Sequence, residues 1–155
     1  MEQIPSLVVD FFSTQGFVIV SSIDKNGFPH ISCKDIIKID ARGEVYLIDV
    51  HHGLTVENIR RNPQVSISAV DEPKFMGYCL KGRAVVIPDH KISQEYIQAW
   101  EDNITSRLSK RLIFNLTRDN PRRHHPEAKL PRPKHLIIIT VEKIVDLTPG
   151  YLRKD

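Results

Sequence analysis

The residues from His51 to Asn58 could bind an anion at the start of a short helix. Gly53, Thr55 and Asn58 follow one another there at helical spacing. The first N–H groups of a helix have no partner inside it, and the helix dipole adds partial positive charge. A Gly-x-Thr turn at this point could offer backbone N–H groups and a hydroxyl to a phosphate. The pattern also fits a structural role, in which Thr55 only caps the helix and Asn58 is a surface amide.

The histidines do not form a recognisable metal site. His51 and His52 are neighbours, as are His124 and His125. Adjacent side chains in an extended chain point apart, so two such pairs do not supply four converging ligands. We therefore expect no bound metal.

Length and composition favour a single domain over residues 1–155. The chain is 41% hydrophobic and 26% charged, and it has no apolar run of the roughly 18 residues that a membrane span needs. Met1–Asp10 lacks the basic residues of a secretory signal. Cys33 and Cys79 lie far apart in strand-like runs, which indicates structural, reduced thiols. We expect a cytoplasmic protein with no membrane partner.

Positive charge is concentrated in one part of the chain. The net charge is +3, but residues 103–135 contain nine Lys or Arg residues against two acidic residues, a net of +7. A solvated helix and a basic loop would explain this asymmetry, and so would attraction for an anionic ligand or surface. Nucleic acid is not favoured, because Phe114 is the only aromatic residue in this stretch and zinc-finger spacing is absent.

Hydrophobic periodicity and turn residues predict three helices and six strands. Asn26-Gly27 indicates a hairpin turn, since both residues tolerate positive φ. Gly77 and Gly82 indicate bends or bulges within a strand. The expected helices cover residues 5–15, the short stretch that ends before Asn62-Pro63, and residues 93–116. The expected strands cover residues 17–23, 28–39, 45–50, 65–69, 75–87 and 136–145.

This order of elements predicts an α+β protein. Closely spaced hairpins imply antiparallel pairing, and six or more strands favour a barrel because closure removes the exposed strand edges. We expect a small antiparallel β-barrel with an N-terminal helix, a short helix after the third strand and a long helix before the last strand. Trp100 and its apolar helical neighbours should pack against the core or against a second copy.

Five short motifs follow one another along the chain: Gly27-x-Pro29-His30, EVYLID, Thr55-x-x-Asn58-Ile59, Asn62-Pro63-x-Val65-Ser66 and GYCLKGRAVVI. Their order and spacing resemble the pyridoxamine 5′-phosphate oxidase-like family of FMN-binding split barrels, from about Phe11 to Leu147. The stretch HLIIITVEKIVDLTPG is similar to the closing strand of small prokaryotic members. The resemblance implies an antiparallel split β-barrel and a homodimer with FMN at the subunit interface.

The resemblance also implies where FMN lies. One strand runs beside the flavin ring and ribityl chain, the end of a second faces the flavin, and the following helix start meets the phosphate. In that order, the implied residues are Ser32, Cys33 and Lys34; Asp49, Val50 and His51; and Thr55 and Asn58.

Leu54 departs from the family pattern. Many members carry a cation just before or at the position of Thr55, and a leucine brings no charge to the phosphate. A charge-assisted contact of this kind is worth roughly 1.5–3 kcal/mol. Either another cation substitutes, or the flavin binds weakly, or the ligand differs. Lys34 is the first candidate substitute, followed by Arg60, Arg61 and the basic loop from Arg122 to Lys134.

The implied activity is that of an FMN-dependent oxidoreductase that passes electrons between a reductant and a small acceptor. The flavin would carry the redox chemistry, and the sequence identifies no catalytic acid or base. Genuine pyridoxamine 5′-phosphate oxidase activity is not expected, because the closing segment TPGYLRKD lacks the arginine- and histidine-bearing end of those enzymes. Two alternatives stay open: a non-catalytic flavin-binding or sensing protein, and a split barrel that holds a deazaflavin or haem.

Overall fold

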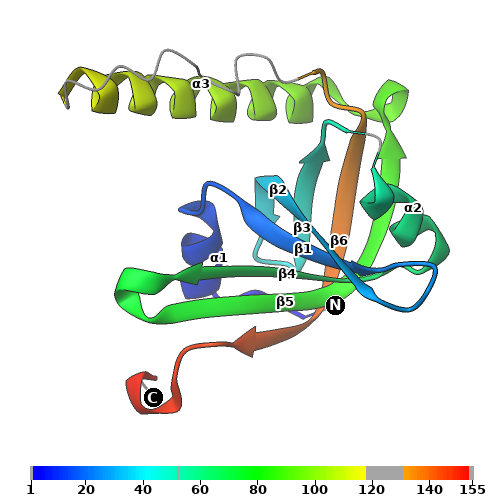
Figure 1. The fold of residues 1–155 in the computed structure, drawn as a ribbon, viewed down its shortest axis with the longest axis horizontal. Helices are drawn as coiled ribbons and strands as arrows, with labels where there is room; N and C mark the ends of the chain where they lie inside the picture. Colours follow the sequence, from blue (N-terminus) through cyan, green and yellow to red (C-terminus); the bar gives the residue numbers. More distant parts are fainter. Residues whose placement is uncertain (1, 52, 118–130, 154–155) are drawn as a thin grey trace.

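In the computed structural model, which describes residues 2–51, 53–117 and 131–153, six antiparallel strands close into a barrel (Figure 1). The strand order around the barrel is β1-β2-β3-β6-β5-β4. The strands are β1 Val18–Ile23, β2 Pro29–Asp40, β3 Glu44–Asp49, β4 Gln64–Asp71, β5 Met76–Pro88 and β6 His135–Asp146. The helices are α1 Ser6–Ser13, α2 Leu54–Arg61 and α3 Gln94–Thr117, with short 3-10 turns at Glu72–Lys74, Asp89–Lys91 and Gly150–Leu152. The predicted α+β barrel and the positions of its three helices are confirmed.

Tight turns join the first three strands, as predicted. Gly27 has a φ of +87°, and Asp24 Oδ1 accepts hydrogen bonds from the N–H groups of Asn26 and Phe28 at 2.7 and 2.9 Å. Gly43 has a φ of +112° in the turn between β2 and β3. These residues form hairpins because the left-handed conformation costs glycine little.

Only one of the two glycines in β5 marks a bulge. The register of β5 against β6 shifts between Lys81 and Gly82, which confirms the prediction for Gly82. A Cβ on Gly82 would lie 2.0 Å from the carbonyl oxygen of Thr140. Of the bend or bulge predicted at Gly77, the bulge is absent, since β5 pairs with β4 in unbroken register there. Gly77 allows a close backbone approach instead, because a Cβ would lie 2.9 Å from the carbonyl oxygen of Ala69.

Two apolar clusters hold the fold together. The larger one fills the barrel and is capped by α1, through Val8, Phe11 and Phe12. The smaller one packs α3 against the barrel and includes Trp100, which is 6% exposed, with Tyr46 and Ile48 of β3. Trp100 therefore has the packing role that the sequence predicts.

The long helix α3 lies along one side of the barrel, and its C-terminal part extends beyond the strands (Figure 1). Ile113 in that part is 63% exposed. None of the helices in the described ranges combines the length and the apolar character needed to cross a membrane.

Candidate functional site

A cavity of about 160 Å³ brings together five of the nine predicted site residues. Cys33 and Lys34 reach it from β2, and Asp49, Val50 and His51 reach it from the end of β3. These residues meet because β2 and β3 are hydrogen-bonded neighbours, with Asp35 opposite Ile48. The remaining walls are Phe17, Asp35, Ile48 and Trp100.

The polar centre of this cavity is a buried carboxylate with two basic neighbours. Asp49 is 1% exposed, and its Oδ1 accepts a hydrogen bond from the ammonium group of Lys34, which is 11% exposed. Asp49 Oδ2 lies 3.3 Å from Nδ1 of His135, its direct partner in the β3–β6 pairing. A charge is buried at low cost only when it is paired and hydrogen-bonded. The pairing of β2 with β3 and the bond to Asp49 thus fix the ammonium group of Lys34 at the cavity wall.

A second buried ion pair closes another side of the cavity. Arg107 of α3 holds Asp35 through two parallel bonds, Nη1–Oδ1 at 2.7 Å and Nη2–Oδ2 at 2.6 Å. The guanidinium group lies 5.1 Å from the centre of the Phe17 ring and also donates to the carbonyl oxygen of Gly16. The bidentate pair anchors α3 to β2 next to Cys33 and Lys34.

The start of α2, at Leu54, follows the cavity residue His51 closely in the chain. Two side-chain hydrogen bonds tie it to the barrel. Thr55 donates to Ser32 Oγ at 2.9 Å, and Asn58 Nδ2 donates to Ser22 Oγ at 3.1 Å. Thr55 and Asn58 are each 2% exposed. The N-cap residue is Gly53, which has extended backbone, and no side chain caps the helix. The structural interpretation of Thr55 as a cap and Asn58 as a surface amide is therefore wrong in both details.

The predicted site residues thus form two neighbouring groups linked along β2. Ser32 contacts the α2 group, and Cys33 and Lys34 line the cavity. Leu54 lies in the first turn of α2 and is 57% exposed, so its side chain does not pack into the core.

The cations that could substitute for a charge at position 54 differ in the contacts that they already make. Lys34 is bound to Asp49. Arg61 donates to Asn58 Oδ1 at 3.1 Å and also to the carbonyl oxygen of Ile23. Arg60 is exposed in the last turn of α2. Most of the basic loop from Arg122 to Lys134 lies outside the described residues. Within the described part of the chain, no three His, Cys, Asp or Glu side chains converge on a metal position.

Five residues of the cavity region were not singled out from the sequence: Phe17, Asp35, Ile48, Arg107 and His135. Arg107 and Asp35 are 72 positions apart in the chain, and His135 and Asp49 are 86 apart. Their pairing depends on strand register and on the placement of α3. For His135, a base at the start of a strand-like run was the available signal, since such residues are rarely buried without a partner.

These features define a class of small closed antiparallel barrels with a small cavity close to a helix start that no side chain caps. Residues 4–147 match the sequence model of the pyridoxamine 5′-phosphate oxidase family. The chain belongs to that family. No curated protein sequence matched it.

Solved structures share the fold at low sequence identity. HupZ of Group A Streptococcus is 22% identical, covering 95% of this chain and 96% of HupZ, with a TM-score of 0.66. HutZ, the haem storage protein of Vibrio cholerae, is 18% identical over 94% of each chain, with a TM-score of 0.54. An F420 reductase is 14% identical over 83% of this chain and 88% of its own, with a TM-score of 0.52. The fold is thus shared by proteins described with different ligands.

Proposed function

We propose that the chain is an FMN-binding oxidoreductase that acts as a homodimer and passes electrons between a reductant and a small acceptor. The observation that carries the proposal is that the cavity of about 160 Å³ lined by Lys34 and Asp49, here called the Lys34–Asp49 cavity, lies close to the start of α2. The first would take the flavin ring, and the second would take the phosphate. Family membership supports this assignment.

The start of α2 suits a phosphate group. No side chain caps the helix, and the N–H of Val56 donates to the carbonyl oxygen of Gly53 at 3.1 Å. The N–H groups of Leu54 and Thr55 would then meet an anion, and the helix dipole favours negative charge there. The hydrogen bonds of Thr55 to Ser32, which is partly buried, and of Asn58 to Ser22, which is buried, hold this turn against the barrel. Leu54 adds no charge, which favours a weaker phosphate contact than a lysine or arginine would give.

The cavity suits one edge of a flavin ring. When bound, FMN would supply the electron-transfer chemistry. Lys34 would place a fixed positive charge beside the ligand, with Asp49 holding the ammonium group in position. Phe17 and Trp100 supply apolar, aromatic walls that limit the access of water.

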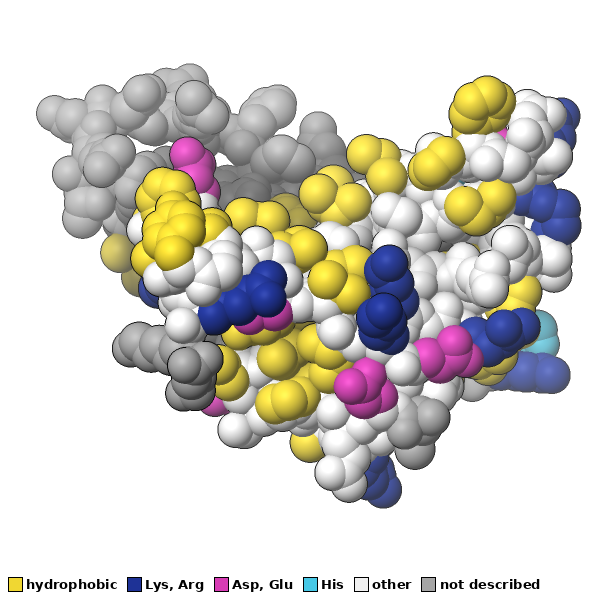
Figure 2. All heavy atoms as spheres, turned by 90° about the horizontal axis from the view of Figure 1, so that it is seen from below, with side chains coloured by type: hydrophobic (Ala, Val, Ile, Leu, Met, Phe, Trp, Pro, Cys, Tyr) yellow, Lys and Arg dark blue, Asp and Glu magenta, His cyan; other side chains and the backbone are white. Residues whose placement is uncertain are grey.

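A second copy of the chain would complete the site. The cavity of about 160 Å³ is smaller than the roughly 300–1,000 Å³ of typical ligand pockets. Exposed hydrophobic side chains on the barrel strands offer a surface for that copy: Ile19 is 45% exposed, Ile31 64% and Val70 64%. Figure 2 shows hydrophobic side chains on the face seen from below, interspersed with Lys, Arg, Asp and Glu side chains. Apolar surface of this kind is typical of an interface.

Haem is a second candidate ligand, on one specific observation. His51 lines the cavity and is exposed, so its imidazole could reach an iron atom. The likeness to the haem storage protein HutZ is compatible with this alternative. A deazaflavin is the third candidate, and the F420 reductase has the same fold.

Absorption spectroscopy separates these ligands. The purified protein is titrated with FMN, riboflavin, a deazaflavin and haemin, and we expect saturable binding of FMN that is tighter than binding of riboflavin. An equal dissociation constant for FMN and riboflavin would show that the start of α2 does not read the phosphate. Tight haemin binding with a Soret shift that His51→Ala removes, and no FMN binding, would replace the proposal with the haem alternative.

Reduction kinetics separate an enzyme from a storage or sensing protein. The FMN-loaded protein is mixed with NADH or NADPH without oxygen, and the loss of flavin absorbance is followed. Reduction faster than that of free FMN supports an oxidoreductase. No acceleration with either nicotinamide, and none on reoxidation by small acceptors, favours the non-catalytic alternative.

A further inference from the structure

Phe17 is an exposed aromatic residue in the wall of the Lys34–Asp49 cavity. It lies between the end of α1 and the start of β1, lines the cavity and is 51% exposed. An exposed side chain in a connecting segment normally exchanges between rotamers within nanoseconds. A planar ligand gains most from an aromatic wall that is already held in one orientation, because less side-chain freedom is lost on binding. The contacts that hold Phe17 therefore affect ligand affinity.

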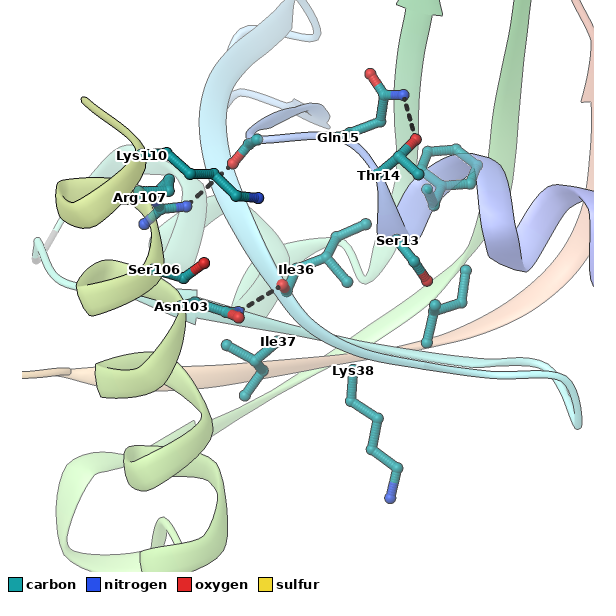
Figure 3. A pocket seen from close by; sticks show the side chains of 13 residues that line it. Ser13, Thr14, Gln15, Ile36, Ile37, Lys38, Asn103, Ser106, Arg107 and Lys110 are labelled. Atoms are coloured by element: carbon teal, nitrogen blue, oxygen red, sulfur yellow. Dashed lines mark hydrogen bonds between the residues drawn. The ribbon is translucent and has the colours of Figure 1, made fainter. Parts of the chain in front are cut away.

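Arg107 of α3 contacts Phe17 without lining the same cavity. Its Cζ atom lies over the Phe17 ring, 5.1 Å from the ring centre. Arg107 is absent from the walls of the Lys34–Asp49 cavity and instead lines a second cavity, of about 250 Å³, between α1, β2 and α3 (Figure 3). The guanidinium group thus supports the ring of Phe17 and leaves the Lys34–Asp49 cavity free for a ligand.

The guanidinium group of Arg107 is itself held by three hydrogen bonds. Its Nη1 and Nη2 atoms donate to Oδ1 and Oδ2 of Asp35 at 2.7 and 2.6 Å. Nη1 also donates to the carbonyl oxygen of Gly16, the residue before Phe17, at 3.2 Å. The side chains of Arg107 and Asp35 are only 18% and 8% exposed, so water competes little for these bonds. A guanidinium group in a bidentate pair cannot rotate freely, and it presents a fixed surface to the ring.

One side of α3 carries this support together with a second cavity wall. Trp100, Asn103 and Arg107 follow one another at spacings of three and four residues, so they lie on one side of the helix, and Trp100 lines the Lys34–Asp49 cavity. Asn103 Nδ2 donates to the carbonyl oxygen of Ile36 at 3.3 Å. Figure 3 shows Asn103 and Arg107 on the side of α3 that faces β2. Asn103 therefore anchors α3 to β2 as Arg107 does, but through the backbone of Ile36.

We propose that Arg107 is a positioning residue: it holds Phe17 in the orientation in which that side chain contacts the planar aromatic ring of a bound ligand. The contact with a ligand rests on the proposed binding of FMN, whereas the support of Phe17 by Arg107 does not. Lysine cannot replace arginine in this role, because an ammonium group pairs with Asp35 as a point charge and lacks the planar face that stacks on a ring.

Two substitutions of Arg107 separate this role from folding. Arg107→Lys keeps the buried carboxylate of Asp35 paired, so it removes the stacked group with the least effect on stability. If this variant does not fold, Arg107→Met combined with Asp35→Asn takes its place, because it removes both charges of the pair. A well-dispersed NMR spectrum shows that each variant is folded.

A double-mutant cycle measures whether Arg107 acts through Phe17. FMN is titrated by flavin fluorescence against the full-length wild type, Arg107→Lys, Phe17→Leu and the double variant. Each single substitution should weaken FMN binding by about two- to tenfold, which is the range of one aromatic contact. The double variant should bind FMN no more weakly than Phe17→Leu alone, because no ring is left for Arg107 to support. Asn103→Ala, which removes the other bond between α3 and β2, is the control and should leave FMN affinity unchanged.

A second readout needs no ligand. The ring signals of Phe17 are followed in 1H–13C NMR spectra of the ligand-free protein and are identified by their absence in Phe17→Leu. In Arg107→Lys these signals should move toward the positions of a freely rotating, exposed phenylalanine. In Asn103→Ala they should stay in place.

Three results would overturn the inference. Unchanged Phe17 signals in a folded Arg107→Lys variant would show that other contacts hold the ring. An equal change in Asn103→Ala would show that the docking of α3 as a whole sets the ring position. Losses of FMN affinity that multiply in the double variant would show that Arg107 acts independently of Phe17.

Failure of the proposed function gives a different result. A wild-type protein that does not bind FMN would contradict FMN binding and with it the contact between Phe17 and the flavin. Phe17 signals that move in Arg107→Lys and not in Asn103→Ala would still establish that Arg107 holds the ring in the cavity wall.

Discussion

Asp49 balances two basic side chains at one end of the barrel. Its carboxylate is 1% exposed and contacts both Lys34 and His135. The Coulomb attraction within such a group is strong because little water screens it, but each charge has lost most of its hydration. Removing one partner of the Lys34–Asp49 pair therefore costs folding free energy, even where the intact pair adds little to the stability of the fold.

Asp49→Asn should destabilise the fold by about 3–5 kcal/mol, because it leaves the buried ammonium group of Lys34 uncompensated. Urea unfolding monitored by circular dichroism measures the change. The double variant Lys34→Met with Asp49→Asn should recover part of the loss, since it removes both charges. Arg42→Met, which breaks the exposed Arg42–Asp40 pair, serves as the control and should have little effect. A small loss in Asp49→Asn would show that Lys34 reaches water when its partner is removed.

Leu54 marks the position where a cation would improve phosphate binding. Because its side chain is 57% exposed, Leu54→Lys should change the free energy of unfolding by no more than about 0.5 kcal/mol. FMN affinity should rise by about 1.5 kcal/mol, roughly tenfold, and the gain should shrink as salt increases. Flavin fluorescence titration at two salt concentrations measures both effects.

The matched control for this variant is Leu7→Lys, on an exposed position of α1. It adds the same charge away from α2 and should leave FMN affinity unchanged. An equal gain in FMN affinity in both variants would mean that the added net charge, and not its position, strengthens binding. A folded Leu54→Lys protein with unchanged affinity would refute the idea that this position faces the phosphate.

The separate parts of the candidate site were predictable from the sequence, but their contacts were not. Thr55 and Asn58 carry a local helix-start pattern, so their neighbourhood could be identified from spacing. Their partners Ser32 and Ser22 belong to other strands and depend on how α2 packs on the barrel. The second ion pair, between Asp35 and Arg107, joins β2 to α3 and has no local signal at all.

At the scale of secondary structure, β5 and β6 form the longest pairing of the barrel, from Tyr78–Asp146 to Pro88–His135. The bulge at Gly82 interrupts this pairing and bends it. The hairpins at Asn26-Gly27 and Gly43 were predictable because turn chemistry is local. The absence of a bulge at Gly77 was not, since a strand glycine can equally mark a close approach of two backbones.

Gly82→Ala should destabilise the protein by at least about 1–3 kcal/mol, because the new Cβ would overlap the carbonyl group of Thr140, a backbone atom that cannot rotate away. A thermal melt measures the loss. Gly16→Ala is the matched control, since nothing lies within 4 Å of its added Cβ. A melting temperature for Gly82→Ala equal to that of the control would show that β6 can shift without cost.

At the scale of the whole molecule, the proposed dimer depends on the outer faces of the barrel strands. Ile31 on β2 is 64% exposed and two residues from Cys33, which lines the cavity. If a second copy covers this face, Ile31→Glu would bury a charge in the interface. We expect it to shift the protein from a dimer to the 17.8 kDa monomer in light scattering at micromolar concentration, and to weaken FMN binding in parallel.

Leu7→Glu is the control for this substitution, since Leu7 is similarly exposed but lies on α1. It should leave the mass unchanged. A wild-type protein that is already monomeric at this concentration would contradict the proposed assembly, and the site would then have to bind FMN within one chain.

The position of β6 has a consequence for the order in which the protein acquires its structure during synthesis. β6 lies between β3 and β5 in the barrel, yet it follows α3 in the chain. Until the ribosome has released residues 135–146, both neighbours have an unpaired edge and the apolar interior is open to solvent. Such edges pair readily with other chains, so the nascent protein is most prone to aggregation while α3 is being translated. Asp49, which lines the Lys34–Asp49 cavity, gains its His135 partner only after that stage, and ligand binding must follow it.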